Sequence, residues 1–146
     1  MNQQRRTPHP RRALALAGLA LAILGTALSV APAQAASRSL STQTIAIDAV
    51  EVTVAGTVDG SRAQFSIELN THSGDLANDL SKSRLTVAGV NFPNGKWSGD
   101  PVGGHHRSGR LTFVGRTKQV GTVSLRLSGW TKALTFRWSA KGQPLR

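Results

Sequence analysis

The chain has 146 residues, no cysteine, and 18 Lys and Arg residues against 7 Asp and Glu residues, which gives a formal net charge of +11. The absence of cysteine excludes disulfide bonds, thiolate metal ligands and a thiol nucleophile. Beyond residue 35 the basic residues occur singly, so no specific nucleic-acid interface of clustered cations is expected. A diffuse positive charge instead favours contact with anionic surfaces.

The first 35 residues have the three parts of a secretory signal peptide. A basic start is followed by an uncharged apolar stretch at 13–30 and by the small-residue site Ala33-Gln34-Ala35. This order predicts export, with cleavage between Ala35 and Ala36. The mature chain is then 36–146, a length that suits one domain, and the loss of four arginines lowers the net charge to +7.

Two other interpretations of the N-terminal segment stay open. Its apolar stretch of 18 residues is at the lower limit for a membrane-spanning helix, so an uncleaved segment would act as an anchor. Arg11-Arg12 also resembles a twin-arginine export signal, although most of the usual surroundings are missing. In each case the chain is predicted to work outside the cytoplasmic membrane, and to contact the membrane only through a retained signal segment.

Beyond the signal segment the dominant hydrophobic period is two, which is typical of half-buried β-strands. The clearest alternation runs over 63–70. A break of phase at Ala49 indicates a bulge or a strand that changes sheets. The other strand candidates lie at 45–54, 85–87, 90–92, 111–114, 123–127 and 134–138.

Turn residues separate these segments, for example Asp59-Gly60 and Asp100-Pro101, and only 75–83 is a weak candidate for a short helix. About seven short strands with frequent turns predict an all-β fold, an antiparallel β-sandwich of immunoglobulin-like type without a disulfide. Large aromatic side chains would anchor its core, and if two of them were exposed they would form a platform for sugar rings. The candidate anchors are Trp97, Trp130 and Trp138, with Trp97 and Trp130 as the candidate platform.

Three histidines lie in glycine-containing segments at predicted strand ends, where loops commonly carry function. His72 directly follows the clearest strand, and His105 and His106 precede a shorter one. His72 with one or both of His105 and His106, together with a carboxylate from Asp75 or Asp79, would suit Zn²⁺, Cu²⁺ or Ni²⁺. The alternative is that the histidines bond to loop backbone or pack on tryptophan, because their spacing lacks the fixed offsets of zinc motifs.

Two further kinds of chemistry are weaker hypotheses. Asp75, Asn78 and Asp79 offer oxygen ligands for Ca²⁺, but their offsets do not match a calcium loop, which favours a solvated turn. Ser-His neighbours such as Ser73 and His72 do not lie on a strand-to-helix elbow. A hydrolase is therefore a remote third hypothesis.

The segments around the histidines resemble a signature. Thr71-His72-Ser73 is followed by Trp97-x-Gly99, by Gly103-Gly104-His105-His106-x-x-Gly109-x-Leu111-x-Phe113 and by Phe136-x-Trp138. Over most of residues 45–138 the chain thus resembles a group of small exported prokaryotic domains that have no established activity. In that group an acidic residue takes the position of Asn70, which implies that this chain lacks one potential metal ligand.

These features predict a secreted, non-enzymatic binding or accessory module of the cell envelope. Its partner would be an envelope polyanion, a glycan or a protein, and its expected working surface is the end with His72, His105 and His106. The main alternative is an extracytoplasmic transition-metal-binding protein that uses the same histidines with Asp75 and holds zinc or copper.

Overall fold

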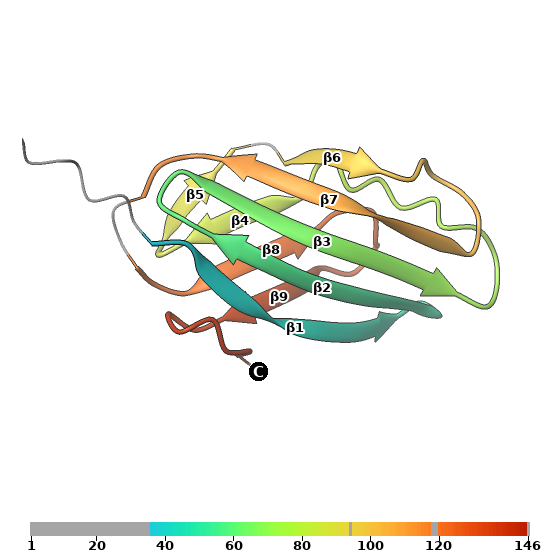
Figure 1. The fold of residues 1–146 in the computed structure, drawn as a ribbon. Coiled ribbons are helices and arrows are strands. Elements are labelled where there is room, and N and C mark those ends of the chain that lie inside the picture. The colour runs from blue at the N-terminus through green and yellow to red at the C-terminus, as the bar shows by residue number, and fades with distance from the viewer. Residues whose placement is uncertain (1–35, 94, 118–119, 146) are drawn as a thin grey trace, which may run out of the picture. The chain divides into compact units, whose positions relative to one another are not determined.

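A computed structural model describes residues 36–93, 95–117 and 120–145, which form two antiparallel β-sheets packed face to face (Figure 1). The predicted signal peptide, its cleavage site after Ala35 and the alternative anchor at 13–30 lie outside the described residues. In the part of the chain that the structure describes, no helix is long and apolar enough to cross a membrane.

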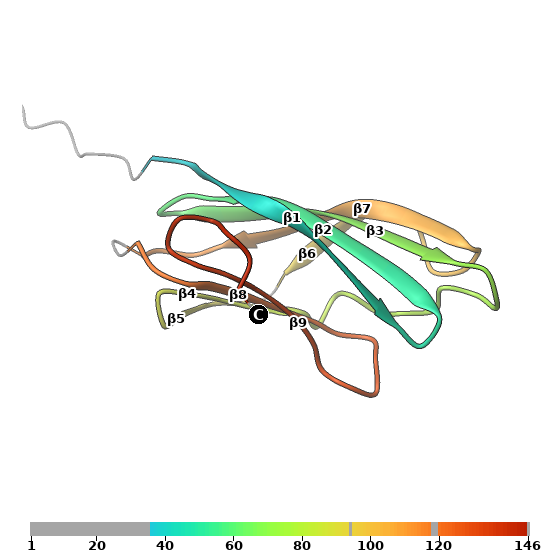
Figure 2. The same ribbon diagram turned by 90° about the horizontal axis from the view of Figure 1, so that it is seen from below.

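The five-stranded sheet has the order β1-β2-β3-β7-β6, and the four-stranded sheet has the order β5-β4-β8-β9. Figure 2 shows the two sheets as separate layers. The strands of the first sheet are β1 (Arg38–Ile47), β2 (Val50–Val58), β3 (Arg62–Thr71), β7 (His106–Val114) and β6 (Lys96–Gly99). Those of the second sheet are β5 (Val90–Phe92), β4 (Arg84–Val87), β8 (Val123–Leu127) and β9 (Leu134–Trp138).

The predicted all-β antiparallel sandwich is confirmed, with nine strands in the described residues where about seven were expected. One additional strand arises because the candidate 45–54 divides between β1 and β2. The other is β6, a short and mostly exposed segment that the alternation pattern missed. It forms because it pairs with β7, which places Trp97 opposite Leu111. Pairing with a neighbour, and not hydrophobic alternation, therefore defines this edge strand.

The break of phase at Ala49 is a hairpin turn, so the expected bulge or sheet change does not occur there. Asp48 and Ala49 both have positive φ (50° and 64°), as a two-residue turn between twisted strands requires. The turn joins β1 to β2 as neighbours in one sheet. The shift of register in this pair lies instead between Leu40 and Gln43.

Residues 75–83 form an extended connection, and the short helix considered for them is wrong. The N–H of Leu76 donates to the carbonyl of Gly104, and the N–H of Gly103 donates to the carbonyl of Leu76, both at 2.9 Å. These bonds tie the segment to the loop before β7 and take up backbone groups that a helix would use. Leu76 and Leu80 are fully buried, so the connection also contributes to the core.

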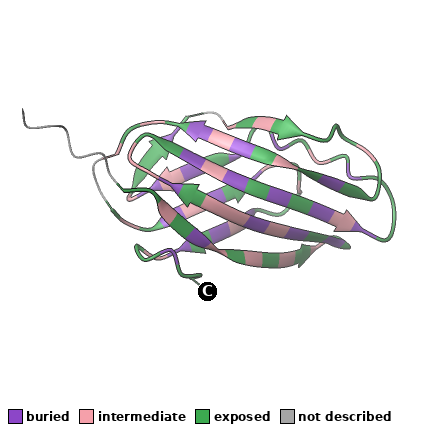
Figure 3. Ribbon diagram, in the orientation of Figure 1, coloured by how far each residue is buried: buried purple, intermediate pink, exposed green. Residues whose placement is uncertain are grey.

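The core lies between the sheets and contains the inward-facing residues of each alternating strand (Figure 3). Phe65 and Phe113 of the first sheet meet Phe136 and Trp138 of the second. The ring centroids of Phe65 and Trp138 are 5.8 Å apart, and those of Phe65 and Phe113 are 6.1 Å apart at an edge-to-face angle. In a chain without cysteine, this aromatic cluster joins the sheets where a disulfide does so in many other sandwiches.

Of the three predicted tryptophan anchors, Trp138 is fully buried, whereas Trp97 and Trp130 are half-buried and pack against the core. The indole N–H of Trp138 donates to the carbonyl of Ser41 at 2.7 Å and so links β9 to β1. The indole N–H of Trp130 is covered and has no hydrogen-bond partner among the described residues.

We expect Trp138→Phe to lower the free energy of unfolding by about 1–3 kcal/mol more than Trp130→Phe. The first substitution removes the hydrogen bond to Ser41 and leaves a cavity at a fully buried position, whereas Trp130 is half-buried and its indole N–H has no partner among the described residues. Urea titration of both variants measures the difference. Equal losses in the two variants would show that the bond to Ser41 does not stabilise the fold.

Candidate functional site

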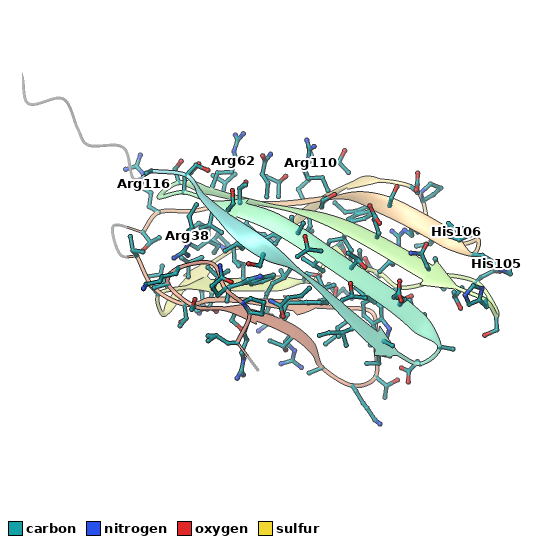
Figure 4. The ribbon with its side chains drawn as sticks, turned by 60° about the horizontal axis from the view of Figure 1, so that its bottom comes forward. Arg38, Arg62, His105, His106, Arg110 and Arg116 are labelled. Carbon is teal, nitrogen blue, oxygen red and sulfur yellow. The ribbon has the colours of Figure 1, made fainter. Side chains whose placement is uncertain are left out.

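The two histidine loops lie next to each other at the end of the sandwich where β3 finishes and β7 begins (Figure 4). The N–H of Thr71 donates to the carbonyl of His105 at 2.9 Å. Gly103 and Gly104 lead into β7 with positive φ (112° and 71°), a conformation that side-chain-bearing residues rarely adopt. The two histidine loops are therefore neighbours at one end of the sandwich, and the glycines allow the turn that brings them there.

The histidine side chains do not converge on one point. His72, His105 and His106 are all exposed, and Nδ1 of His106 lies 2.7 Å from Oδ1 of Asn70. An amide oxygen only accepts, so His106 donates from Nδ1. Within the described ranges, no group of three or more His, Asp and Glu side chains is close enough together to hold a metal ion. The metal site of these histidines with Asp75 stays a prediction.

The residue at this end that sequence reasoning missed is Arg107, which is only 4% exposed. Its Nε donates to the carbonyl of Asp100 at 3.0 Å, and its Nη1 donates to the carbonyl of Asn78. The guanidinium carbon lies 5.0 Å from the centroid of the Trp97 ring, as in a cation–π contact. Burial lowers the pKa of Arg107, and the carboxylates of Asp79 and Asp100 act in the opposite direction. Arg107 thus holds the segments of Asn78 and Asp100 against β7.

Glycines of the histidine signature make room for Trp97. A Cβ atom at Gly109 would lie 2.5 Å from the Trp97 ring, and one at Gly99 would lie 2.3 Å from the carbonyl oxygen of Ser108. Glycine at both positions therefore lets β6 and β7 approach closely, with the Trp97 ring against Gly109. Trp97 contacts Gly109 and Arg107 and is half-buried. The platform of Trp97 and Trp130 for sugar rings stays a prediction.

Carboxylates near this end close turns. Oδ2 of Asp100 accepts from the N–H of Ser108 at 2.7 Å and from its hydroxyl at 3.1 Å, and these bonds lower the pKa of Asp100. Oδ1 of Asp79 accepts from the N–H of Ser81 at 2.9 Å. Asp79 thus closes a turn, the alternative to a calcium site. The Ser108 hydroxyl donates to a carboxylate, that of Asp100.

A second surface, which the sequence did not indicate, lies on the outer face of β3, β7 and β6. Strand pairing places Arg110 between Ser66 and Ser98, and Thr112 between Gln64 and Lys96. Figure 4 shows the side chains of Arg62 and Arg110 projecting from the same side of the molecule. This surface, called here the basic face, is an open depression of about 640 Å³ lined by Arg62, Gln64, Ser66, Glu68, Lys96, Ser98, Ser108, Gly109, Arg110 and Thr112.

The basic face is polar throughout. Its lining contains three cations, one carboxylate and no aromatic or aliphatic side chain. Arg110 stands at its centre, and both of its cross-strand neighbours, Ser66 and Ser98, are small hydroxyl residues. The single carboxylate, Glu68, lies in the next row opposite Ser108. The centre of the depression therefore combines positive charge with hydrogen-bonding groups.

No protein-family model, no curated protein and no solved structure matches the chain. The resemblance to small exported prokaryotic domains stays a prediction for this reason. Several residues of the signature nevertheless have a structural role here, such as the contact of Gly109 with Trp97. The two candidate surfaces of the sandwich are therefore the histidine end and the basic face.

We expect Asp100→Asn to reduce the acid dependence of stability below about pH 4, the region in which a free Asp titrates. The folded-state pKa of Asp100 is lowered by Ser108, so the carboxylate stabilises the fold above its unfolded pKa. That contribution is lost as the pH falls through the folded pKa. Thermal unfolding of both proteins from neutral to acidic pH should give melting curves that differ at neutral pH and converge in acid. A constant difference at all pH values would contradict this role.

Proposed function

We propose that this chain is an exported, non-enzymatic binding module of the cell envelope that contacts an acidic glycan through the basic face. The observation that carries the proposal is the position of Arg62, Lys96 and Arg110 around one depression whose lining side chains all have polar groups, apart from Gly109. Cations attract the anionic groups of such a polymer and guide its approach. The hydroxyl and amide groups between the cations supply hydrogen bonds for sugar hydroxyls.

The form of the basic face favours a polymer over a small ligand. Small-molecule sites are usually enclosed and mostly apolar, whereas this depression is open and polar. The basic face also continues toward β2. A further hollow of about 350 Å³ is lined by Ala55 and Gly56 of β2 together with Gln64, Ser66 and Arg110 of the basic face. An extended chain can lie across several strands and contact cations that are spread over three of them.

The start of the sandwich is compatible with cleavage at the predicted site. β1 begins at Arg38, close behind the predicted cleavage site after Ala35. Arg38 donates from Nη1 to the carbonyls of Gly121 and Ala140, and so ties the first strand to two distant turns. Cleavage at the predicted site would leave this cross-link intact.

We expect the mature protein to bind immobilised polygalacturonate, a carboxylated polysaccharide, and not the neutral polysaccharide dextran. Arg62→Glu/Arg110→Glu should weaken binding at least about tenfold, because it reverses two of the three cations on the basic face. The control Arg137→Glu/Lys141→Glu changes the net charge equally at exposed positions elsewhere and should have less than about a twofold effect. Biolayer interferometry at low ionic strength measures both.

Two outcomes would contradict the basic face as the binding surface. One is equal weakening in both double variants, which would mean that only the net charge matters. The other is the absence of binding to polygalacturonate by the unaltered protein. Circular dichroism of each variant establishes that the sandwich is intact.

A metal-binding function at the histidine end is the second candidate. The hydrogen bond from Thr71 to the His105 carbonyl favours it, because that bond brings the two histidine loops together. Untagged protein that is loaded with Zn²⁺ or Cu²⁺ and dialysed should then retain about one ion per chain. His105→Ala/His106→Ala should release that ion with the fold intact. If the unaltered protein retains no metal, the candidate is wrong.

A further inference from the structure

The outer face of the four-stranded sheet carries two arginines in opposite positions on neighbouring strands. Arg84 on β4 and Arg126 on β8 are direct cross-strand neighbours, and both are exposed. Like charges placed directly opposite one another destabilise a sheet. The strands β5, β4, β8 and β9 contain no Asp or Glu that would offset the repulsion. The fold therefore tolerates a concentrated positive charge at this place.

Two lysines add to this charge. Lys82, just before β4, and Lys132, just before β9, line the same hollow of about 330 Å³ as Arg84 and Arg126. We call this hollow the cation hollow; no carboxylate lines it, and Trp130, which packs against the core, contributes to its wall.

One carboxylate acts on the edge of the cation hollow. The pKa of Asp79 is lowered first by hydrogen bonds from Ser81 and also by the charge of Lys82. Asp79 therefore offsets part of the charge of Lys82, one of the four cations of the hollow. The arginine pair lies in the strands, which carry no acidic residue.

The wall of the cation hollow is fixed by hydrogen bonds. The N–H of Ser128 donates to Oγ of Ser83 at 3.1 Å, and Nδ2 of Asn78 donates to the carbonyl of Gly129 at 2.9 Å. Gly129 has a φ of 99°, and a Cβ atom there would lie 2.9 Å from the nitrogen of Asp79. The loop between β8 and β9 is thus held against the segment before β4, which lowers the ordering cost of binding a ligand.

We propose that the cation hollow binds the phosphate group of a phosphate ester, with Arg84 and Arg126 as its main ligands. Neighbouring guanidinium groups donate paired N–H groups to phosphate oxygens, and the two lysines add charge without a fixed geometry. A doubly negative phosphate matches four cations better than a single carboxylate does. The hollow leaves room for the organic part of the ester beside Trp130. This site lies on the other sheet from the basic face and does not depend on it.

The test uses sn-glycerol 3-phosphate as the probe and nuclear magnetic resonance titration of the mature protein. We expect the amide resonances of Arg84, Arg126 and Ser128 to shift with the phosphate ester and not with glycerol. Arg84→Gln/Arg126→Gln should weaken binding at least about tenfold, whereas Arg137→Gln, on the same sheet outside the hollow, should have less than about a twofold effect. The double variant should be at least as stable as the unaltered protein, because it removes a repulsive pair.

A second arm identifies the source of the phosphate. Co-sedimentation with vesicles that contain phosphatidic acid, a phosphate monoester, lost in Arg84→Gln/Arg126→Gln, supports the site and assigns it to a lipid headgroup, whereas binding of the soluble ester alone supports it and assigns it to a free ester. The proposal is overturned if the probe shifts no resonance at the hollow, or if Arg137→Gln weakens binding as much as the double variant does. Arg62→Glu/Arg110→Glu should keep the ester affinity, so failure of this site and failure of the basic face are distinguishable.

Discussion

The structure depends on the aromatic cluster that joins its two sheets. With no cysteine in the chain, no disulfide joins the sheets, and Phe65 of the first sheet meets Trp138 of the second at the centre. Because the inward phase of each strand is committed to this core, the outward phase is free to be polar. Both proposed binding surfaces are built from that outward phase, one on each sheet. The free energy gained by burying the core therefore offsets the repulsion between like charges on the two outer faces.

A buried cation organises the end of the sandwich. Arg107 needs hydrogen-bond acceptors when it is removed from water, and it finds the carbonyls of Asp100 and Asn78. Asn78 in turn donates to the carbonyl of Gly129, so one residue connects the histidine end to the loop that shapes the cation hollow. Asn78 therefore connects Arg107 to this loop by two hydrogen bonds, and Ser128 adds a third through Ser83.

The fold could be predicted from the sequence because alternation at 63–70 and 134–138 reports burial directly. The adjacency of the histidine loops followed from their places at strand ends. The basic face could not be predicted, because Arg62, Lys96 and Arg110 are far apart in the chain and only strand register places them together. For Arg107 a signal was present, since it shares the inward phase of Leu111 and Phe113. The general preference of arginine for the surface concealed it.

The proposed binding of an acidic glycan to the outer face of β3, β7 and β6 can be mapped residue by residue. Chemical shifts of ¹⁵N-labelled residues 36–146 are followed during titration with short oligogalacturonates. We expect the largest shifts at the amides of Ser66, Ser98 and Arg110, with smaller changes at the histidine end and on the second sheet. Shifts that are confined to His72 and His105, or that are spread evenly over all exposed basic residues, would contradict it.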